Sequence, residues 1–359
     1  MAFVNRPGIA DADYKVTTHE IVEAIRKAYP GHPRMAAIQR IANNIGVESR
    51  RFTRPLEEVT RTESFGPRNA RAYADVCRLA EAAARRALTA AGLTPADIST
   101  IITFHATGLA IPGLDVHLVN ALEMPQTVRR VPMTQLACAG GAQALGLAAQ
   151  LARPGQPVLV AGAEALSTVY QHSDAELADM IYKLLFGDGG AAAVVSAEPL
   201  KEPGLYIEDT WTYLHRDQAG GSTHYYKLRA DCTGYHFDST PAAVNAVAQV
   251  APEIPWIHHE DWAPEHALIH PGSSKILDLV VQADVCSEKA IRHSRTVLEV
   301  DGNTGGPTVL RILERVHDDP PSAGSLGILF GVGPGFCASA SLTRWTPSPS
   351  GGQRPRREA

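Results

Sequence analysis

Short apolar segments alternate with segments of helical periodicity along this chain of 359 residues, and this alternation limits the possible folds more than any other feature. An alanine-rich stretch over residues 69–91 carries apolar side chains at helical spacing, and Gly92 suits a left-handed helix end. Apolar runs at 98–104, 158–161 and 191–196 have the character of buried strands. Strands that alternate with helices predict parallel-rich sheets covered by helices.

The second part of the chain repeats this order in shorter form, which predicts an internal duplication. A strand precedes His270, a helix is expected over 274–283, and a further strand leads into a glycine-rich loop. We therefore divide the chain into an N-terminal half, residues 1–200, and a C-terminal half, residues 201–345. Residues 346–359 are polar and rich in Pro, Gly and Arg, and are predicted to form a disordered tail.

Cys138 lies where an extended segment beginning at Val131 is expected to run into a helix that ends before Pro154. Unpaired backbone N–H groups and the positive end of a helix dipole favour thiolate over thiol at such a position. The small residues 139–141 let a substrate carbonyl approach the backbone. A nucleophile for acyl transfer and a small buried core cysteine are about equally consistent with this segment alone.

A histidine and an asparagine in the C-terminal part favour the catalytic interpretation. His270 follows a short apolar strand, and Asn303 is expected at a second strand-to-helix corner that begins at Val300, equivalent to the Cys138 corner. A cysteine can hold an acyl group, and a histidine can stabilise the thiolate as an ion pair. The histidine and the amide can both donate hydrogen bonds to a developing oxyanion. The three residue types together suit thioester chemistry.

Five short segments form a recognisable series. In chain order they are the segment around Cys138, Leu185-Phe186-Gly187-Asp188-Gly189, His270-Pro271-Gly272, Gly302-Asn303 and Gly331-Val332-Gly333-Pro334-Gly335. With these motifs the sequence resembles the type III polyketide synthases, which are chalcone-synthase-like members of the thiolase superfamily, over about residues 3–345. Residues 5–7 and 233–237 resemble the bacterial branch. The resemblance implies the duplicated, five-layered αβαβα thiolase-like fold.

The resemblance also implies an iterative acyltransferase. An acyl-CoA or malonyl-derived starter is transferred to Cys138, and decarboxylation of malonyl-CoA supplies the enolate that extends it. His270 maintains the thiolate and, with Asn303, binds the enolate oxygen, while the ring of Phe186 orients the substrates. The chain finally cyclises to an aromatic or pyrone product, with CoA thioesters as substrates and no bound metal or redox cofactor. A homodimer is implied as well, in which Ile111-Pro112-Gly113 reaches toward the partner's cavity.

The positions that shape the substrate cavity depart from those of plant members of the family. By this resemblance they are Ala106, Leu166, Val169, Tyr226, Tyr235 and Gly305. Leu166 and Val169 stand where plant members carry threonines, and Tyr226 stands where they carry glycine. The predicted cavity is more apolar on one wall and crowded at Tyr226, which favours a small or aliphatic starter over coumaroyl-CoA.

The CoA tunnel is expected to have fewer basic residues than in plant members of the family. The predicted CoA-binding residues are Arg40, Gly272 and Lys275. Ala37 and Asn44 replace lysines of plant members. Arg50 and Arg51 either compensate for that loss or are ordinary surface charges.

The composition agrees with a soluble enzyme. The chain is 45% hydrophobic and 20% charged, which allows a sizeable core, and its net charge of -5 gives no reason to expect nucleic acid or an anionic membrane as partner. No signal peptide or long apolar run is present. The five cysteines lack metal-site spacing, and their odd number argues against a disulfide framework, so a reducing cytoplasm is predicted.

Two other functions remain open at this point. A thiolase-fold acyltransferase would move an acyl group from Cys138 to another acceptor without chain extension. A non-catalytic subunit of a larger synthase would be expected to lack Cys138 or His270, and this chain has both.

Overall fold

The computed structural model describes residues 1–172, 175–216, 226–232 and 234–346, and within them ten strands form one hydrogen-bonded sheet. The strands in path order are β12 (His266–Ile269), β13 (Leu326–Gly333), β14 (Cys337–Thr346), β9 (Gly204–Leu214), β1 (Ala2–Val4), β8 (Asp188–Ser196), β7 (Val158–Ala165), β5 (Thr100–His105) and β6 (Arg129–Thr134), with β2 (Gly8–Asp11) beside β8. Two small sheets stand apart, β3 (Tyr14–Thr17) with β4 (Ser49–Phe52) and β10 (Tyr226–Asp231) with β11 (Gly234–Ser239).

The helices pack on both sides of this sheet and between its two arms. They are α1 (Thr18–Ala28), α2 (Met35–Asn44), α3 (Leu56–Val59), α4 (Phe65–Ala91), α5 (Leu114–Ala121), α6 (Gly140–Leu151), α7 (Leu177–Leu185), α8 (Pro241–Val250), α9 (Ser274–Gln282), α10 (Arg292–Asp301) and α11 (Thr308–Asp318). None of the helices in the described part of the chain is long and apolar enough to cross a membrane.

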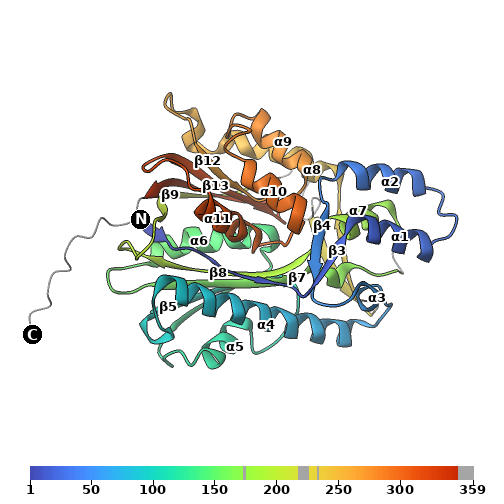
Figure 1. Ribbon diagram of the computed structural model, residues 1–359, viewed down its shortest axis with the longest axis horizontal. Coiled ribbons are helices and arrows are strands. Elements are labelled where there is room, and N and C mark those ends of the chain that lie inside the picture. Colours follow the sequence, from blue (N-terminus) through green and yellow to red (C-terminus); the bar gives the residue numbers. More distant parts are fainter. Residues whose placement is uncertain (173–174, 217–225, 233, 347–359) are drawn as a thin grey trace, which may run out of the picture.

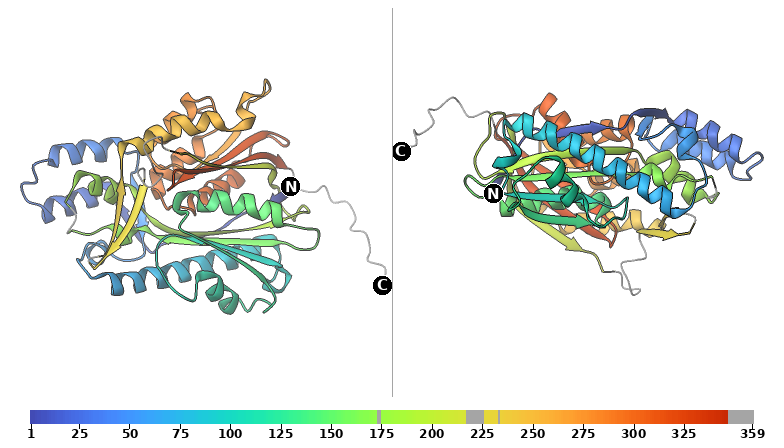
Figure 2. Two further views of the ribbon diagram at one scale, coloured as in Figure 1. Left: turned by 180° about the vertical axis from the view of Figure 1, so that it is seen from behind. Right: turned by 90° about the horizontal axis from the view of Figure 1, so that it is seen from below.

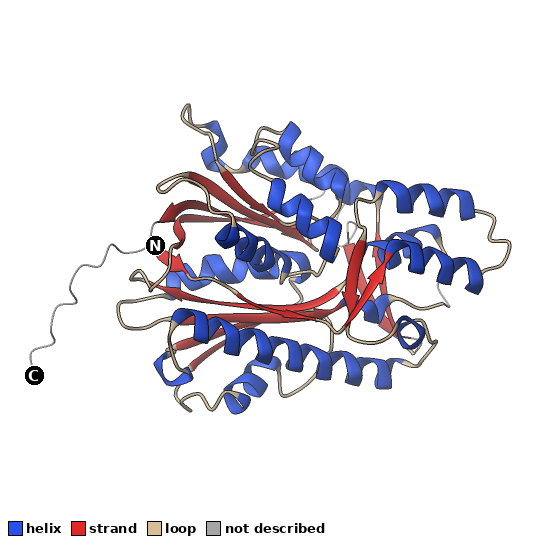
Figure 3. Cartoon of the chain, viewed as in Figure 1, coloured by secondary structure: helices blue, strands red, loops and turns tan. Residues whose placement is uncertain are grey.

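Five layers are visible in Figure 1. Helices α4 and α5 cover the arm that contains β5, β7 and β8, and helices α8, α9 and α10 cover the arm that contains β12 and β13. Helices α6 and α11 fill the space between the two arms, as the colouring by structure type in Figure 3 makes clear. The predicted five-layered αβαβα arrangement is confirmed.

The sheet is less parallel than the sequence predicts. Parallel pairs occur at its two ends, where β5 lies between β6 and β7 and where β12 lies beside β13. The middle of the path, from β7 through β8, β1, β9 and β14 to β13, is antiparallel. One reason is the tight turn between β13 and β14, because a short connection can join only antiparallel neighbours.

Most predicted elements are present within a few residues, and the main exception is the strand predicted before Asn303. The segment that leads to Asn303 is the last turn of α10, not a strand, since Ser294, Val297, Leu298 and Asp301 make one buried helical face. Its last apolar residues fit a short strand equally well when they are considered locally. The corner therefore joins two helices, although α11, which follows it, still packs beside α6.

Thr346, which the sequence analysis assigns to the tail, belongs to a strand. Thr346 is the last residue of β14, where its hydroxyl donates to the Gly204 carbonyl at 2.8 Å. Residues 347–359 lie outside the described residues.

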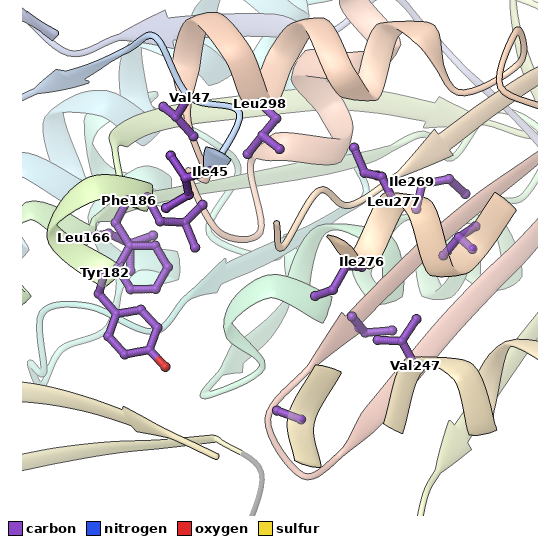
Figure 4. Close-up of a cluster of buried hydrophobic side chains, with 14 of the residues drawn as sticks. Ile45, Val47, Leu166, Tyr182, Phe186, Val247, Ile269, Ile276, Leu277 and Leu298 are labelled. Carbon is purple, nitrogen blue, oxygen red and sulfur yellow. The ribbon is translucent and has the colours of Figure 1, made fainter. Parts of the chain in front are cut away.

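A large apolar cluster joins helices α8, α9 and α10, and the strands that they cover, to the end of the molecule that carries α1, α2 and α7. Figure 2 shows the blue helices α1 and α2 projecting beyond the layered body, and Figure 1 shows β3 and β4 between the two parts. Figure 4 shows part of the cluster, in which Ile45, Val47 and Leu298 lie on one side of Phe186. Burial of this surface fixes the position of α7 relative to α10.

Candidate active site

Four residues singled out in the sequence meet at one pocket. Cys138, Phe186, His270 and Asn303 line it together with Gly272. The other lining residues are Ala137, Tyr182, Leu185, Phe237, Ile276, Val332, Gly333 and Pro334. Both predicted halves of the chain contribute side chains, so the pocket forms only when the whole fold has assembled.

Cys138 sits in a short 3-10 turn, Ala137–Ala139, between the end of β6 and the first turn of α6. The chain turns sharply at Ala137, which has a φ of 44°. The predicted strand-to-helix junction is confirmed. The small residues also serve packing, because a Cβ atom at Gly141 would stand 2.1 Å from the Gly306 carbonyl oxygen.

Burial controls the charge of Cys138 and His270. Desolvation raises the pKa of the Cys138 thiol to about 12, against the smaller opposing effect of its contact with Asn303. Desolvation likewise lowers the pKa of His270 to about 3. Burial thus opposes the charge that the helix end favours, and the thiolate expected from the sequence stays a prediction. Burial therefore favours the neutral form of each group.

His270 is held by its backbone and leaves its ring available. It follows β12 directly, and its N–H donates to the Phe330 carbonyl at 2.8 Å. Among the described residues, neither ring nitrogen of His270 has a hydrogen-bond partner. A buried imidazole of this kind is ready to exchange a proton or donate a hydrogen bond to a ligand.

Asn303 is tied to the end of α7 by its main chain and to the pocket by its side chain. Its N–H donates to the Leu185 carbonyl at 2.9 Å, and its carbonyl accepts from the Gly187 N–H at 3.0 Å. The Oδ1 atom accepts from the Gly305 N–H at 2.8 Å. The Cys138 sulfur lies 3.9 Å from both Nδ2 and Oδ1 of this side chain. The amide can donate to a group that approaches Cys138.

Aromatic rings form one wall of the pocket. Phe186 stacks on Tyr182 with ring centroids 5.2 Å apart, and its edge contact with Phe237 spans 5.3 Å. Figure 4 shows the rings of Tyr182 and Phe186 side by side, with Leu166 next to Phe186. The sequence prediction missed Tyr182 and Phe237. The spacing of four residues between Tyr182 and Phe186, at the end of α7, is the signal that places both on one face.

A buried carboxylate braces the Phe186 corner from behind. Asp188 accepts hydrogen bonds from the N–H and hydroxyl of Thr53, at 2.8 and 3.1 Å, and from the N–H and hydroxyl of Ser167, at 2.7 and 2.6 Å. Burial raises its pKa to about 6 in spite of these four donors. The aspartate of the Phe-Gly-Asp-Gly motif thus connects three segments.

Comparison with known proteins identifies the family. A family model described as chalcone and stilbene synthases, N-terminal domain, matches residues 10–199. Phloroglucinol synthase of Pseudomonas fluorescens is 32% identical over 348 residues, which are 95% of this chain and 98% of that protein. The chain belongs to the chalcone and stilbene synthase family. The 1,3,6,8-tetrahydroxynaphthalene synthase of Streptomyces coelicolor is 30% identical over 352 residues, covering 96% of this chain and 92% of that protein.

Solved structures agree with this assignment. Germicidin synthase from Streptomyces coelicolor, described as a type III polyketide synthase, superposes with a TM-score of 0.90 at 32% identity, and the match covers 96% of this chain and 99% of that one. The 1,3,6,8-tetrahydroxynaphthalene synthase structure gives the same TM-score at 29% identity. The recognition of a type III polyketide synthase, an acyltransferase with a thiolase-like fold, is confirmed.

The cavity positions predicted from this family fall into two groups, and the first surrounds a buried carboxylate. Glu164 accepts from the N–H groups of Ala106 and Thr107, at 2.9 and 3.0 Å, and from the Thr107 hydroxyl at 2.7 Å. Burial raises its pKa to about 7. Gly305 has a φ of +68°, and a Cβ atom there would stand 2.9 Å from Glu164 Cγ. Glycine at this position therefore makes room for the glutamate.

The second group is apolar. Leu166 and Val169 are buried in a 3-10 turn and belong to the same cluster as Phe186, behind the residues that line the Cys138 pocket. Tyr226 and Tyr235 are placed on the paired strands β10 and β11 by their backbones, and their side chains lie outside the described residues.

The predicted CoA-binding residues do not form one cluster with the pocket. Arg40 on α2 and Lys275 in the first turn of α9 are exposed, whereas Gly272 lines the pocket. Both interpretations of Arg50 are wrong, because this residue is fully buried. Arg51 is half-buried and donates to the Ala12 carbonyl at 3.3 Å. In the described part of the chain, no group of three or more His, Cys, Asp or Glu side chains is arranged to hold a metal ion.

Proposed function

We propose that this protein is an iterative type III polyketide synthase that condenses an acyl-CoA or malonyl-derived starter with malonyl-CoA on Cys138. The observation that carries the proposal is the single pocket lined by Cys138, His270, Asn303 and Phe186. The reaction is a decarboxylative Claisen condensation, followed by cyclisation to an aromatic or pyrone product. CoA thioesters are the substrates, without a resident metal or redox cofactor.

Loading begins with the neutral pair. As the Cys138 sulfur attacks the starter thioester carbonyl, its proton passes to the His270 imidazole, and the two opposite charges form together in a desolvated space. The departing CoA thiolate takes that proton when the tetrahedral intermediate collapses. Acyl transfer therefore avoids a free buried thiolate, which the raised pKa of Cys138 disfavours.

Extension uses the two donors that face Cys138. Malonyl-CoA loses carbon dioxide, and the electron pair of the broken bond forms an enolate whose oxygen accepts hydrogen bonds from Asn303 Nδ2 and His270. The enolate carbon attacks the acyl-Cys138 carbonyl, and the cysteine thiolate leaves. The ring of Phe186 disfavours the malonyl carboxylate and orients the substrate, and the lengthened acyl chain is transferred back to Cys138.

The starter is expected to be small, aliphatic or malonyl-derived. The aromatic wall at Tyr182, Phe186 and Phe237 narrows the pocket, and Leu166 and Val169, which pack behind the lining residues, add no hydroxyl group that could reach a coumaroyl phenol. The named relatives are synthases of phloroglucinol and tetrahydroxynaphthalene, which are hydroxylated aromatic compounds. Competition between equal concentrations of an aliphatic acyl-CoA and coumaroyl-CoA tests this choice. A product pool dominated by coumaroyl derivatives would contradict it.

The active form is expected to be a homodimer in the cytoplasm, where thiols stay reduced. Ile111 is fully exposed and Leu109 is more than half exposed, and β6, close by, is an edge strand with mostly exposed side chains. An apolar loop beside an open strand edge is typical of an association surface. Light scattering at micromolar concentration is expected to give twice the monomer mass, and a monomer mass would defeat the proposal.

One assay separates chain extension from simple acyl transfer. Purified protein is incubated with malonyl-CoA and a panel of acyl-CoAs, and the products are analysed by mass spectrometry. Polyketide products support the proposed function. Acyl groups moved to another acceptor without loss of carbon dioxide would support the acyltransferase alternative, which does not require Asn303 or Phe186.

A further inference from the structure

Strand β4 and the residues beside it contact both corners of the pocket. On the Asn303 side, the Glu48 N–H donates to the Glu299 carbonyl at 2.7 Å, and the Ser49 hydroxyl donates to the Val300 carbonyl at 2.8 Å. On the Phe186 side, Thr53 donates twice to Asp188. The strand therefore connects the last turn of α10 to the segment that follows α7.

Arg50 lies at the centre of this connection. Its guanidinium donates to the Leu184 carbonyl, at the end of α7. Its Cβ atom fills the space between the two corners, 3.0 Å from where a Cβ atom would lie at Gly187 and 3.3 Å from where one would lie at Gly302. The neighbouring Leu185 carbonyl accepts the Asn303 N–H. Arg50 thus holds the peptide directly before the one that positions Asn303.

The energetics of Arg50 do not suggest a contribution to stability. The residue has no exposed surface, and its Nε and Nη1 atoms have no hydrogen-bond partner among the described residues. Burial lowers its pKa to about 9, and within the described residues the ionisable group that opposes this effect is the Tyr170 hydroxyl. A buried cation without a carboxylate is unfavourable, and an apolar side chain of similar volume in such a place is often neutral or stabilising.

We propose that Arg50 is a positioning residue for malonyl-CoA decarboxylation, acting through the Leu184 carbonyl to hold Phe186 and Asn303 in register across the pocket. This inference rests on the proposed function. Arg50 contacts neither Cys138 nor His270 in the structure, so it should affect the extension step and not the loading step. A displacement of about 1 Å at a reacting group costs on the order of a hundredfold in rate.

The test compares wild type with Arg50→Met, which keeps the apolar stem and removes the donors. Three quantities are measured: the rate at which malonyl-CoA alone is decarboxylated to acetyl-CoA, the rate of acyl-Cys138 formation by intact-mass spectrometry, and the urea midpoint of unfolding. We expect decarboxylation to fall by about 10- to 100-fold, loading to stay within about threefold of wild type, and the urea midpoint not to fall. Arg50→Lys, which keeps the charge and a donor, is expected to recover part of the decarboxylation.

Val316→Ala serves as the control, because Val316 is buried near the far end of α11, and its truncation lowers stability without a contact to either corner. Its ratio of decarboxylation to loading should equal that of wild type. If wild type is active and Arg50→Met decarboxylates malonyl-CoA at the same rate, the inference is overturned. It is also overturned if the loading rate, the decarboxylation rate and the urea midpoint of Arg50→Met all fall together. If Arg50→Met fails to fold, the inference is overturned when the ratio of decarboxylation to loading in Arg50→Lys equals that of wild type. A wild type that decarboxylates no malonyl-CoA refutes the proposed function itself.

Discussion

Replacement of Asn303 by alanine should separate chain extension from acyl loading. In the structure Asn303 Nδ2 stands 3.9 Å from the Cys138 sulfur, fixed in orientation by the Gly305 N–H bond to Oδ1. The amide is therefore preorganised to donate to an enolate formed beside the thioester. Loss of one such donor costs about 2.7–4 kcal/mol of transition-state stabilisation, which is a factor of roughly 100–1,000 in the decarboxylation rate.

Loading should respond differently in Asn303→Ala and His270→Ala. His270 receives the thiol proton during loading, so His270→Ala is expected to slow both loading and decarboxylation. Asn303→Ala is expected to leave loading within a few-fold of wild type. Its Gly305 N–H loses an acceptor, which costs about 1–3 kcal/mol of stability, so the assays are run well below the unfolding temperature.

The assays are acetyl-CoA release from malonyl-CoA and the intact mass of the acyl-enzyme. Asn120→Ala is the matched control, because it makes the same chemical change on the exposed surface of α5, and it should match wild type in both assays. The division of roles is refuted if Asn303→Ala and His270→Ala lose loading to the same extent while both remain folded. A decarboxylation rate in Asn303→Ala within threefold of wild type would show that this amide does not bind the enolate.

Three further outcomes follow from the described contacts. Cys138→Ala is expected to lose the acyl adduct that intact-mass spectrometry detects on wild type, and an adduct that persists would place the nucleophile elsewhere. Asp188→Ala strands the donors of Thr53 and Ser167 and should lower the free energy of unfolding by about 3–5 kcal/mol, measured by urea titration; an unchanged midpoint would contradict its bracing role. Burial lowers the pKa of His266 to about 4 from 6.5, so the unfolded chain binds more protons between these pH values. The stability of wild type relative to His266→Phe should therefore fall by up to about 3 kcal/mol as the pH drops from 6.5 to 4, and parallel urea midpoints across that range would refute it.

Cys138, His270 and Asn303 could be predicted from the sequence because each sits at a local backbone signal, whereas the lining residues Tyr182 and Phe237 were missed. Cys138 follows an extended run and precedes small residues, His270 follows an apolar strand, and Asn303 lies among glycines. Such signals depend on neighbours a few residues away, so they survive without knowledge of the fold. The family resemblance then placed Phe186 beside them, and the pocket brings all four together.

Local patterns were less informative where a short apolar run is compatible with both a helix and a strand. The residues before Asn303 were predicted as a strand, and they form the end of α10 because their buried face completes the packing against β12 and α11. The direction of the middle strands was missed for a related reason. Whether two strands pair parallel or antiparallel depends on the path that the connections between them take across the molecule. That path is not encoded in the residues of the strand itself.

Tertiary structure alone decided how deeply the ionisable groups of the site are buried. In the sequence, Cys138 lies just before a helix start, which favours a thiolate, and Arg50 is one of two adjacent basic residues of a kind usually exposed. The fold buries both, which raises the pKa of one, lowers the pKa of the other, and turns a presumed surface cation into a contact with the Leu184 carbonyl. A side chain is buried by residues from segments that are distant in the chain. The free energy of a charge on it depends more on this burial than on its sequence neighbours. The sequence thus determined which groups can perform the chemistry, and the packing of the fold determined their burial and their positions.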